Sequence, residues 1–241
     1  MDLGKALRDL QRKSLPDDRP KAKAPLVEMF WSVQGEGHFV GTPMAFVRTA
    51  TCPLRCRYCD TPESYTANAR FPVRFGVRDQ QETNPVDGAR AAELVQKLAQ
   101  VAAPGIRKHR VSVTGGEPLV FPGFLREFGR AVRQNGFAMH LETAAVHPEA
   151  LAECIDQVDH LSADYKLPET LAAPADAALA LAAGQDYGAR HVRCCELALR
   201  RGATVDVKIV LTDAVSDLGF ERALQQLSPL RERILLVLQP V

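Results

Sequence analysis

The sequence contains no long apolar run, no internal repeat and almost no net charge. With 30 basic and 29 acidic residues among 241, its formal net charge is +1, so it has no global field that would attract nucleic acid or an anionic membrane surface. No stretch approaches the roughly 18 apolar residues of a membrane-spanning helix, and residues 1–24 are a charged leader without a signal peptide's apolar segment. We therefore expect a cytoplasmic protein that holds any anionic ligand with local groups.

The length and the 46% hydrophobic content favour one domain, residues 25–241, after the leader. Short β-branched runs alternate with stretches of helical spacing, which is typical of a parallel sheet covered by outer helices. The strands are predicted at residues 44–49, 109–114, 137–143, 159–164, 204–211 and 233–239. Helices are predicted at residues 88–103, 123–136 and 217–227.

Six βα units are two short of a closed eight-fold barrel, so we expect an α/β fold, a partial (β/α)6 TIM-like barrel. Reactive groups in such barrels collect at the carboxyl ends of the strands. The segment 63–86 fits no periodic template and is predicted to be an insertion or a lid loop.

The chain has six cysteines, and three of them form one tight cluster that has no fourth member nearby. A reducing compartment makes disulfides unexpected, so a tight cluster points to metal binding or catalysis. "CPLRCRYC" supplies Cys52, Cys56 and Cys59 without a fourth ligand nearby, and neither His38 nor His109 has the usual spacing of a zinc site. Three thiolates on a cubane iron-sulfur cluster leave one iron open, which suits a cluster that binds an exchangeable ligand.

The remaining cysteines, Cys154, Cys194 and Cys195, fall in two further stretches predicted to be helical, residues 151–158 and 191–202. Buried free thiols that act as small apolar side chains are the common outcome there.

The C-x3-C-x2-C spacing resembles that of the radical S-adenosylmethionine (SAM) superfamily, whose open iron binds the amino and carboxylate groups of SAM. "TGGEP", Thr114 to Pro118, is similar to that superfamily's second signature. Gly115 and Gly116 let the backbone approach a ligand, and Glu117 offers a carboxylate to the SAM ammonium. Without the resemblance, this stretch could equally be a plain turn.

Read in order, "WSVQGEG", "GTPMAFVRT" and "CDT" narrow the resemblance to the 7-carboxy-7-deazaguanine synthase family. The likeness is strong over residues 28–62 and 111–118, and weaker through "LET", "SADYKLP", "VKIV" and "LQPV". It implies a carbon-nitrogen lyase that contracts 6-carboxy-5,6,7,8-tetrahydropterin to 7-carboxy-7-deazaguanine with release of ammonia. It also implies a 4Fe-4S cluster, SAM and Mg²⁺ as cofactors, a flavodoxin-like or ferredoxin-like electron donor, and a homodimer.

The resemblance assigns roles to individual residues. The pterin would be bound by Gln34, Gly35, Glu36, Arg48 and Thr114, with the planar Arg48 fork on the substrate carboxylate. SAM would be bound by Tyr58, Asp60, Gly116, Glu117, Asp164, Tyr165 and Lys166, and Mg²⁺ by the Thr61 hydroxyl. Without the family, residues 34–36 could be a polar turn and Arg48 a solvated cation at a strand end.

The chain departs from the family pattern in two places. Ala144-Ala145 replaces a glycine-containing stretch after Thr143, and Gln239-Pro240-Val241 follow the sixth strand directly, where many relatives continue. Two other functions remain open: a radical SAM activase that forms a glycyl radical on a partner protein, and a zinc-binding interaction module. The sequence does not distinguish tRNA modification, DNA modification and nucleoside antibiotics as the use of the product.

Overall fold

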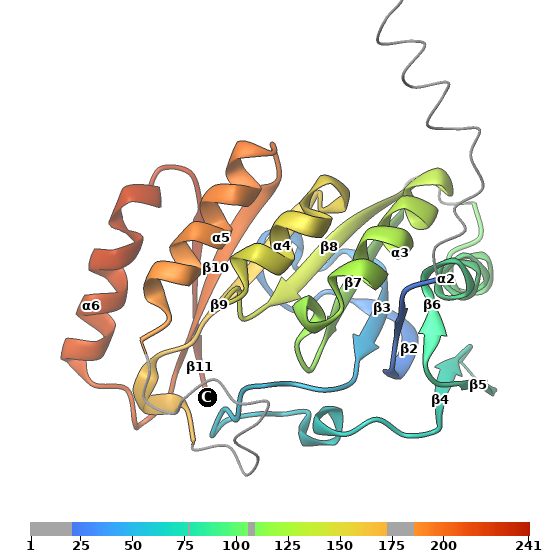
Figure 1. Ribbon diagram of the computed structural model, residues 1–241, viewed down its shortest axis with the longest axis horizontal. Coiled ribbons are helices and arrows are strands. Elements are labelled where there is room, and N and C mark those ends of the chain that lie inside the picture. The colour runs from blue at the N-terminus through green and yellow to red at the C-terminus, as the bar shows by residue number, and fades with distance from the viewer. Residues whose placement is uncertain (1–20, 77, 106–108, 173–185) are drawn as a thin grey trace, which may run out of the picture.

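The computed structural model describes residues 21–76, 78–105, 109–172 and 186–241. Within them, nine strands form one sheet in the order β11-β10-β9-β8-β7-β3-β2-β4-β5, which does not close on itself (Figure 1). Six neighbouring strands are parallel. They are β3 (Pro43–Thr49), β7 (His109–Gly115), β8 (Phe137–Thr143), β9 (His160–Tyr165), β10 (Thr204–Leu211) and β11 (Leu235–Pro240). All six predicted strands are present, with ends shifted by at most two residues, and the partial barrel is confirmed.

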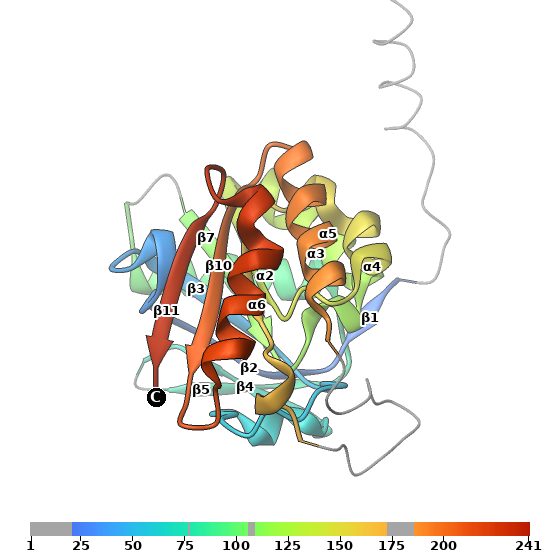
Figure 2. The ribbon, with the colours of Figure 1, turned by 90° about the vertical axis from the view of Figure 1, so that its left-hand side faces the viewer.

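Helices connect these strands and cover one face of the sheet (Figures 1 and 2). They are α2 (Gly88–Ala102), α3 (Pro122–Gln134), α4 (Pro148–Cys154), α5 (Gly188–Arg200) and α6 (Asp217–Leu227). The helices predicted at residues 88–103, 123–136 and 217–227 correspond to α2, α3 and α6, and the helical stretches predicted around the remaining cysteines correspond to α4 and α5. Gly136 follows the end of α3 with φ +82°, the left-handed conformation in which glycine commonly ends a helix.

The segment 63–86 is not the irregular loop that the sequence predicted. It contains β4 (Arg70–Arg74) and β5 (Asp79–Thr83), an antiparallel hairpin whose first strand lies parallel to β2 (Leu26–Val33). Phe71 and Val73 alternate into the core with no exposed surface, but five residues are too few for that alternation to stand out in the sequence. A second, two-stranded sheet pairs β1 (Lys23–Ala24) with β6 (Val86–Asp87).

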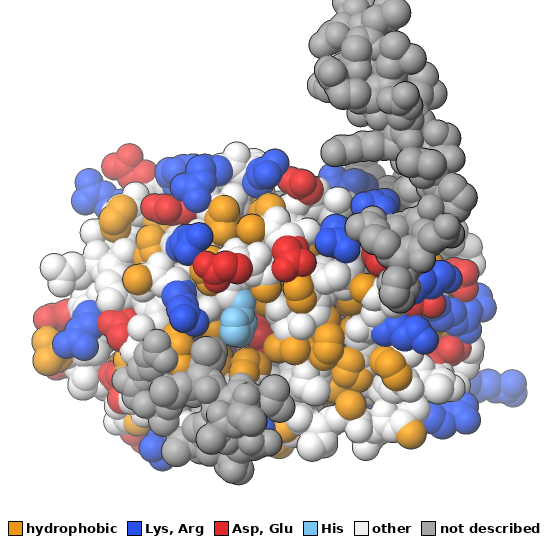
Figure 3. All heavy atoms as spheres, in the orientation of Figure 1, with side chains coloured by type: hydrophobic (Ala, Val, Ile, Leu, Met, Phe, Trp, Pro, Cys, Tyr) orange, Lys and Arg blue, Asp and Glu red, His pale blue; other side chains and the backbone are white. Residues whose placement is uncertain are grey.

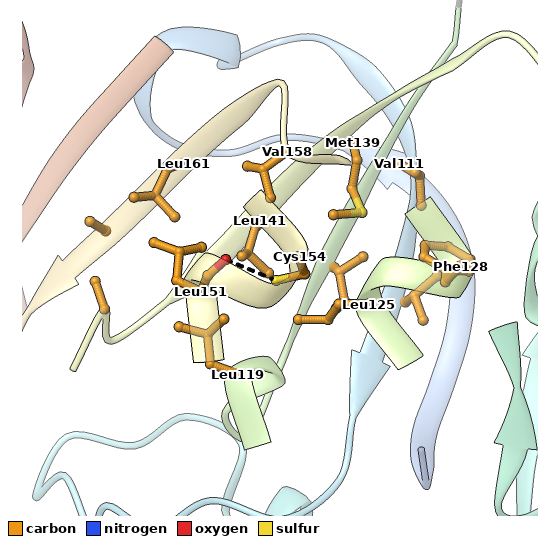
Figure 4. Close-up of a cluster of buried hydrophobic side chains, with 14 of the residues drawn as sticks. Val111, Leu119, Leu125, Phe128, Met139, Leu141, Leu151, Cys154, Val158 and Leu161 are labelled. Carbon is orange, nitrogen blue, oxygen red and sulfur yellow. Dashed lines mark hydrogen bonds between the residues drawn. The ribbon is translucent and has the colours of Figure 1, made fainter. Parts of the chain in front are cut away.

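The main hydrophobic core lies between the sheet and the helices. Figure 4 shows Leu125 and Phe128 of α3 beside Met139 and Leu141 of β8, with Cys154 among them. Cys154, Cys194 and Cys195 are free, buried thiols in helices, as predicted. A smaller apolar cluster lies apart from this core, formed by Leu54, Ala144, Val146, Leu171 and Tyr187, with Cys52 and Cys56 packed against it.

The face covered by helices has acidic and basic side chains interspersed, without a region of one sign in the visible part (Figure 3). This mixture agrees with the near-zero net charge of the whole chain. No helix in the described ranges is both long enough and apolar enough to span a bilayer.

Candidate functional site

A cavity of about 380 Å³ opens at the carboxyl ends of the parallel strands. All but one of the site residues predicted from the sequence line it. These are Gln34, Gly35, Glu36, Arg48, Cys52, Cys56, Tyr58, Cys59, Asp60, Thr61, Thr114, Gly116, Glu117, Asp164 and Lys166. Segments far apart in the sequence therefore meet where a partial barrel places its reactive groups.

Tyr165 is the exception, because the structure places its side chain outside the cavity. Successive side chains of a strand point to opposite faces, so Asp164 faces the cavity and Tyr165 faces the helices. The Tyr165 hydroxyl donates to Gln226 of α6, and its ring packs against His191 of α5. The sequence match covered all three residues from 164 to 166, but strand geometry separates them.

The cysteine loop, residues 51–61, follows β3 and is held mainly by backbone contacts. Thr51 N donates to Ser64 O at 2.6 Å, and Thr51 O accepts from Glu117 N at 2.9 Å. A Cβ built on Gly116 would lie 2.1 Å from Thr51 O. On Gly115, whose φ is +126°, it would lie 2.3 Å from the Thr49 backbone. Both glycines are therefore required for the loop to pack on the end of β7.

The three cluster cysteines share one wall of the cavity, and all are free thiols. Burial raises the pKa of Cys52 to about 12, with the nearby Glu117 carboxylate adding to the effect. Burial also raises the pKa of Cys56, while the Lys166 ammonium opposes that shift. No three His, Cys, Asp or Glu side chains within the described ranges converge on a single metal ion. Thiolates that bind different irons of one cubane need not converge on one point, so this wall fits a cluster.

Glu117 is a buried carboxylate at the cavity wall, 1% exposed. Its Oε1 accepts from Leu119 N at 2.9 Å and from Thr143 Oγ1 at 2.5 Å, and its Oε2 accepts from Ala144 N at 2.9 Å. In the described part of the chain it forms no salt bridge. One Oε2 lone pair therefore remains for a cationic ligand.

The Ala144-Ala145 departure does not prevent this arrangement. Ala145 has φ +54°, the left-handed conformation that favours glycine, and it has no exposed surface. That turn directs Ala144 N toward Glu117, and the Thr143 hydroxyl accepts from Ala145 N at 3.0 Å. The chain thus adopts the required turn with alanine, at a cost of about 1–2 kcal/mol in backbone strain.

Residues 34–39, here called the 34–39 loop, reach the cavity with their first three members, Gln34, Gly35 and Glu36. Gln34 Nε2 donates to Glu142 Oε1 at 2.9 Å, and Gln34 Oε1 accepts from Glu36 N at 3.2 Å. Lys208 Nζ donates to Glu36 Oε2 at 2.8 Å. The amide and the carboxylate are therefore oriented by partners on β8 and β10.

Arg48 lies beside an aromatic pair at the end of β3. Its Nε donates to Glu28 at 3.2 Å, and its guanidinium carbon is 5.9 Å from the centroid of the Phe30 ring. Phe30 and Phe46 stack with centroids 5.1 Å apart, and both line the cavity. A planar ligand with a carboxylate fits this combination of an aromatic wall and a guanidinium.

A charged chain connects the strand ends to the cysteine loop. Lys166 Nζ donates to Asp164 at 2.6 Å and to the Tyr58 hydroxyl at 3.2 Å. Burial works to lower the pKa of Lys166, but Asp164, Tyr58 and Cys56 outweigh it and raise the pKa well above its ordinary value. Asp164 Oδ1 is buried and has no partner among the described residues, so an acceptor at the cavity remains free.

Thr61 and Asp60 form the exposed rim of the cavity next to Cys59. The Thr61 hydroxyl donates to Asp60 Oδ1 at 3.3 Å, which brings two oxygen atoms together. Hard cations such as Mg²⁺ prefer oxygen ligands and retain waters.

Two charged cavity residues, Glu142 and Lys208, were missed from the sequence. Glu142 Oε1 accepts from Ser112 Oγ at 2.6 Å as well as from Gln34, and its Oε2 accepts from Thr114 Oγ1 at 3.1 Å. Lys208 contacts Glu36, as described above. The sequence pattern that could have identified them is a charged residue within a mostly apolar predicted strand. Glu142 lies in "FAMHLET" and Lys208 in "TVDVKIVL".

Comparisons with known proteins agree with this geometry. The model of the radical SAM superfamily matches residues 46–224. A 7-carboxy-7-deazaguanine synthase from Methanopyrus kandleri is 37% identical over 81% of this chain and 72% of its own length. The synthase of the same name from Geobacter sulfurreducens is 34% identical over 92% of this chain and 83% of its own length. The synthase from Methanothermobacter thermautotrophicus is 30% identical over 90% of this chain and 82% of its own length.

Proposed function

The chain belongs to the 7-carboxy-7-deazaguanine synthase family of the radical SAM superfamily, and from this premise we propose the reaction of its cavity. The enzyme contracts 6-carboxy-5,6,7,8-tetrahydropterin to 7-carboxy-7-deazaguanine with release of ammonia, a step of queuosine-type 7-deazapurine biosynthesis. The observation that carries the proposal is one cavity lined by the three cluster cysteines, by Glu117 and by residues 34–36. The relatives' names do not favour a glycyl-radical activase.

Superfamily membership implies a 4Fe-4S cluster and SAM. Cys52, Cys56 and Cys59 would hold the cluster, and Glu117, with its spare lone pair, would accept from the SAM ammonium. A cluster held there would supply the electron for reductive cleavage of SAM, and SAM would supply the radical chemistry that acts on the pterin. Tyr58, Asp60, Gly116, Asp164 and Lys166 would line the SAM subsite.

The protein's own residues bind and orient the pterin. The guanidinium of Arg48 would pair with the substrate carboxylate while Phe30 and Phe46 face the ring. Gln34, Gly35 and Glu36, together with Thr114, would satisfy the ring's donors and acceptors. The Thr61 hydroxyl would bind Mg²⁺ at the rim, where Asp60 supplies a neighbouring oxygen.

The decisive experiment is anaerobic turnover of the reconstituted protein with SAM, reductant, Mg²⁺ and the tetrahydropterin. We expect the deazapurine to form without net consumption of SAM, and about four irons per chain. The Cys56→Ser variant is expected to lose iron and to fall to background activity, whereas Cys154→Ser, which alters a thiol in the core, keeps its iron. Stoichiometric loss of SAM with no deazapurine would contradict the proposal.

The remaining expectations concern surroundings of the enzyme. We propose a cytoplasmic homodimer that receives electrons from a flavodoxin-like or ferredoxin-like donor. Exposed leucines on the edge strand β11 support self-association, since Leu235, Leu236 and Leu238 are 44%, 38% and 47% exposed. The molecular mass in solution tests the dimer.

A further inference from the structure

Strand β10 carries two charged side chains that reach the 34–39 loop. Asp206 and Lys208 are two residues apart, so both project from the same face of the strand, toward the interior of the barrel. Neither has a role in the function proposed above. Both contact the loop on opposite sides of Gly37.

Lys208 contacts the cavity side of the loop. Its Nζ donates to Glu36 Oε2 at 2.8 Å and lies 3.8 Å from Asp164 Oδ2. Burial works to lower the pKa of Lys208, but Asp164 and Glu36 outweigh it and raise the pKa, so the side chain stays an ammonium. A charged hydrogen bond therefore sets the position of the Glu36 carboxylate.

Asp206 contacts the loop on the other side of Gly37, at His38. Its Oδ2 accepts from His38 N at 2.6 Å and lies 3.3 Å from His160 Nε2, and the residue is 3% exposed. Gly37 has φ +65°, and a Cβ there would lie 2.5 Å from Asp206 Oδ2. The loop can approach this carboxylate only because residue 37 is glycine.

Beyond Gly37, Phe39 of the loop packs against side chains of β7, β8 and β9. The Phe39 ring packs against His140 and His160, with centroids 5.9 and 4.8 Å away, and the Arg110 guanidinium lies 3.7 Å from its centroid. These contacts hold residues 37–39 in place. The direction of the Glu36 side chain depends instead on Lys208.

We propose that Asp206 and Lys208 are positioning residues for the pterin, because they hold the 34–39 loop and direct Glu36 into the cavity. This inference rests on the proposed function, since it concerns the same cavity and the same ligand. Lys208 makes the separable contribution: it lies at the cavity, whereas Asp206 is enclosed and its loss also affects folding.

The test is binding of 6-carboxypterin, a fluorescent oxidised form of the substrate, to the reconstituted protein with SAM present. Lys208→Met is expected to raise the dissociation constant about tenfold, the effect of losing one charged hydrogen bond, and to raise KM more than it lowers kcat. Lys208→Arg keeps the charge and should restore most of the affinity. Lys97→Met, an exposed lysine of α2, is the matched control and should bind like the unaltered chain.

A double-mutant cycle separates positioning from a general structural effect. If Lys208 acts through Glu36, then Glu36→Gln combined with Lys208→Met weakens binding no more than the worse single change. Lys208→Gln, which also removes the charge, replaces Lys208→Met in the cycle if the methionine variant does not fold. Affinity of Lys208→Met equal to that of Lys97→Met, or additive losses in the cycle, would overturn the inference. Failure of the unaltered chain to bind or convert the pterin would instead overturn the proposed function.

Discussion

The cysteine loop is held through its backbone, whereas the 34–39 loop is held through charged side chains. In the first, Thr51 exchanges hydrogen bonds with Ser64 and Glu117, and two glycines permit close packing. In the second, Lys208, Asp206 and Glu142 reach the loop from two strands of the barrel.

The difference has a physical consequence. Backbone packing is insensitive to charge but tolerates no added atom, so the cysteine loop should be sensitive to steric changes. Hydrogen bonds to buried charges depend on ionisation, so the 34–39 loop and the groups beneath it should be sensitive to pH and to charge. Three predictions test this contrast.

The largest effect is expected from a methyl group added beneath the cysteine loop. Gly116→Ala places a carbon 2.1 Å from Thr51 O, and we expect a loss of about 3 kcal/mol in the free energy of unfolding, together with a loss of bound iron. Urea unfolding and iron analysis after reconstitution measure both. In Gly35→Ala the new carbon meets nothing within 4 Å, so this control should keep both its stability and its iron. Full stability of Gly116→Ala would remove the steric half of the contrast.

An intermediate effect is expected from acid, beneath the 34–39 loop. Burial lowers the pKa of His140 from 6.5 to about 3, and the neighbouring His160 and Arg110 add to the shift against the opposing Asp206. The unfolded chain therefore binds more protons below pH 6.5, so stability is complete above that pH and falls as the pH drops toward 3. At pH 4.5, two pH units below 6.5, the expected loss from this residue is about 2–3 kcal/mol.

The measurement is urea unfolding at pH 7.5 and pH 4.5. Burial also lowers the pKa of His191, to about 4, so the whole protein loses stability in acid for more than one reason. The informative quantity is the difference between the unaltered chain and His140→Phe, whose ring should still pack against Phe39. Identical pH dependence in the two proteins would show that His140 does not contribute.

The smallest effect, of opposite sign, is expected at Thr51. This β-branched residue has φ +71°, and its buried hydroxyl has no partner among the described residues. Thr51→Gly relieves both penalties and should raise the free energy of unfolding by about 1 kcal/mol, after allowing for the entropy that glycine gains on unfolding. Thr66→Gly is the control: φ is −126° there, so glycine should only destabilise. Equal losses in both variants would show that residue 51 is not strained.

Local patterns made most of the fold predictable. The strands and helices follow from runs of apolar residues whose period is set by the backbone, and the cysteine spacing identifies the cluster loop without any knowledge of the fold. Two features of the structure did not follow from these local patterns. Tyr165 lies in a matching motif but on the wrong face of β9, and the β4-β5 hairpin is too short to show its alternation.

The sequence by itself determined the six parallel strands, the three-cysteine loop and the glycines that allow its packing, because each depends on neighbours along the chain. Only the tertiary structure decided how the 34–39 loop is held. Its partners lie 168 residues away in Asp206 and 172 residues away in Lys208, and no local spacing connects them. They meet because the barrel brings the inner face of β10 beside a loop that leaves β2, and only there does a charge inside an apolar strand acquire a partner.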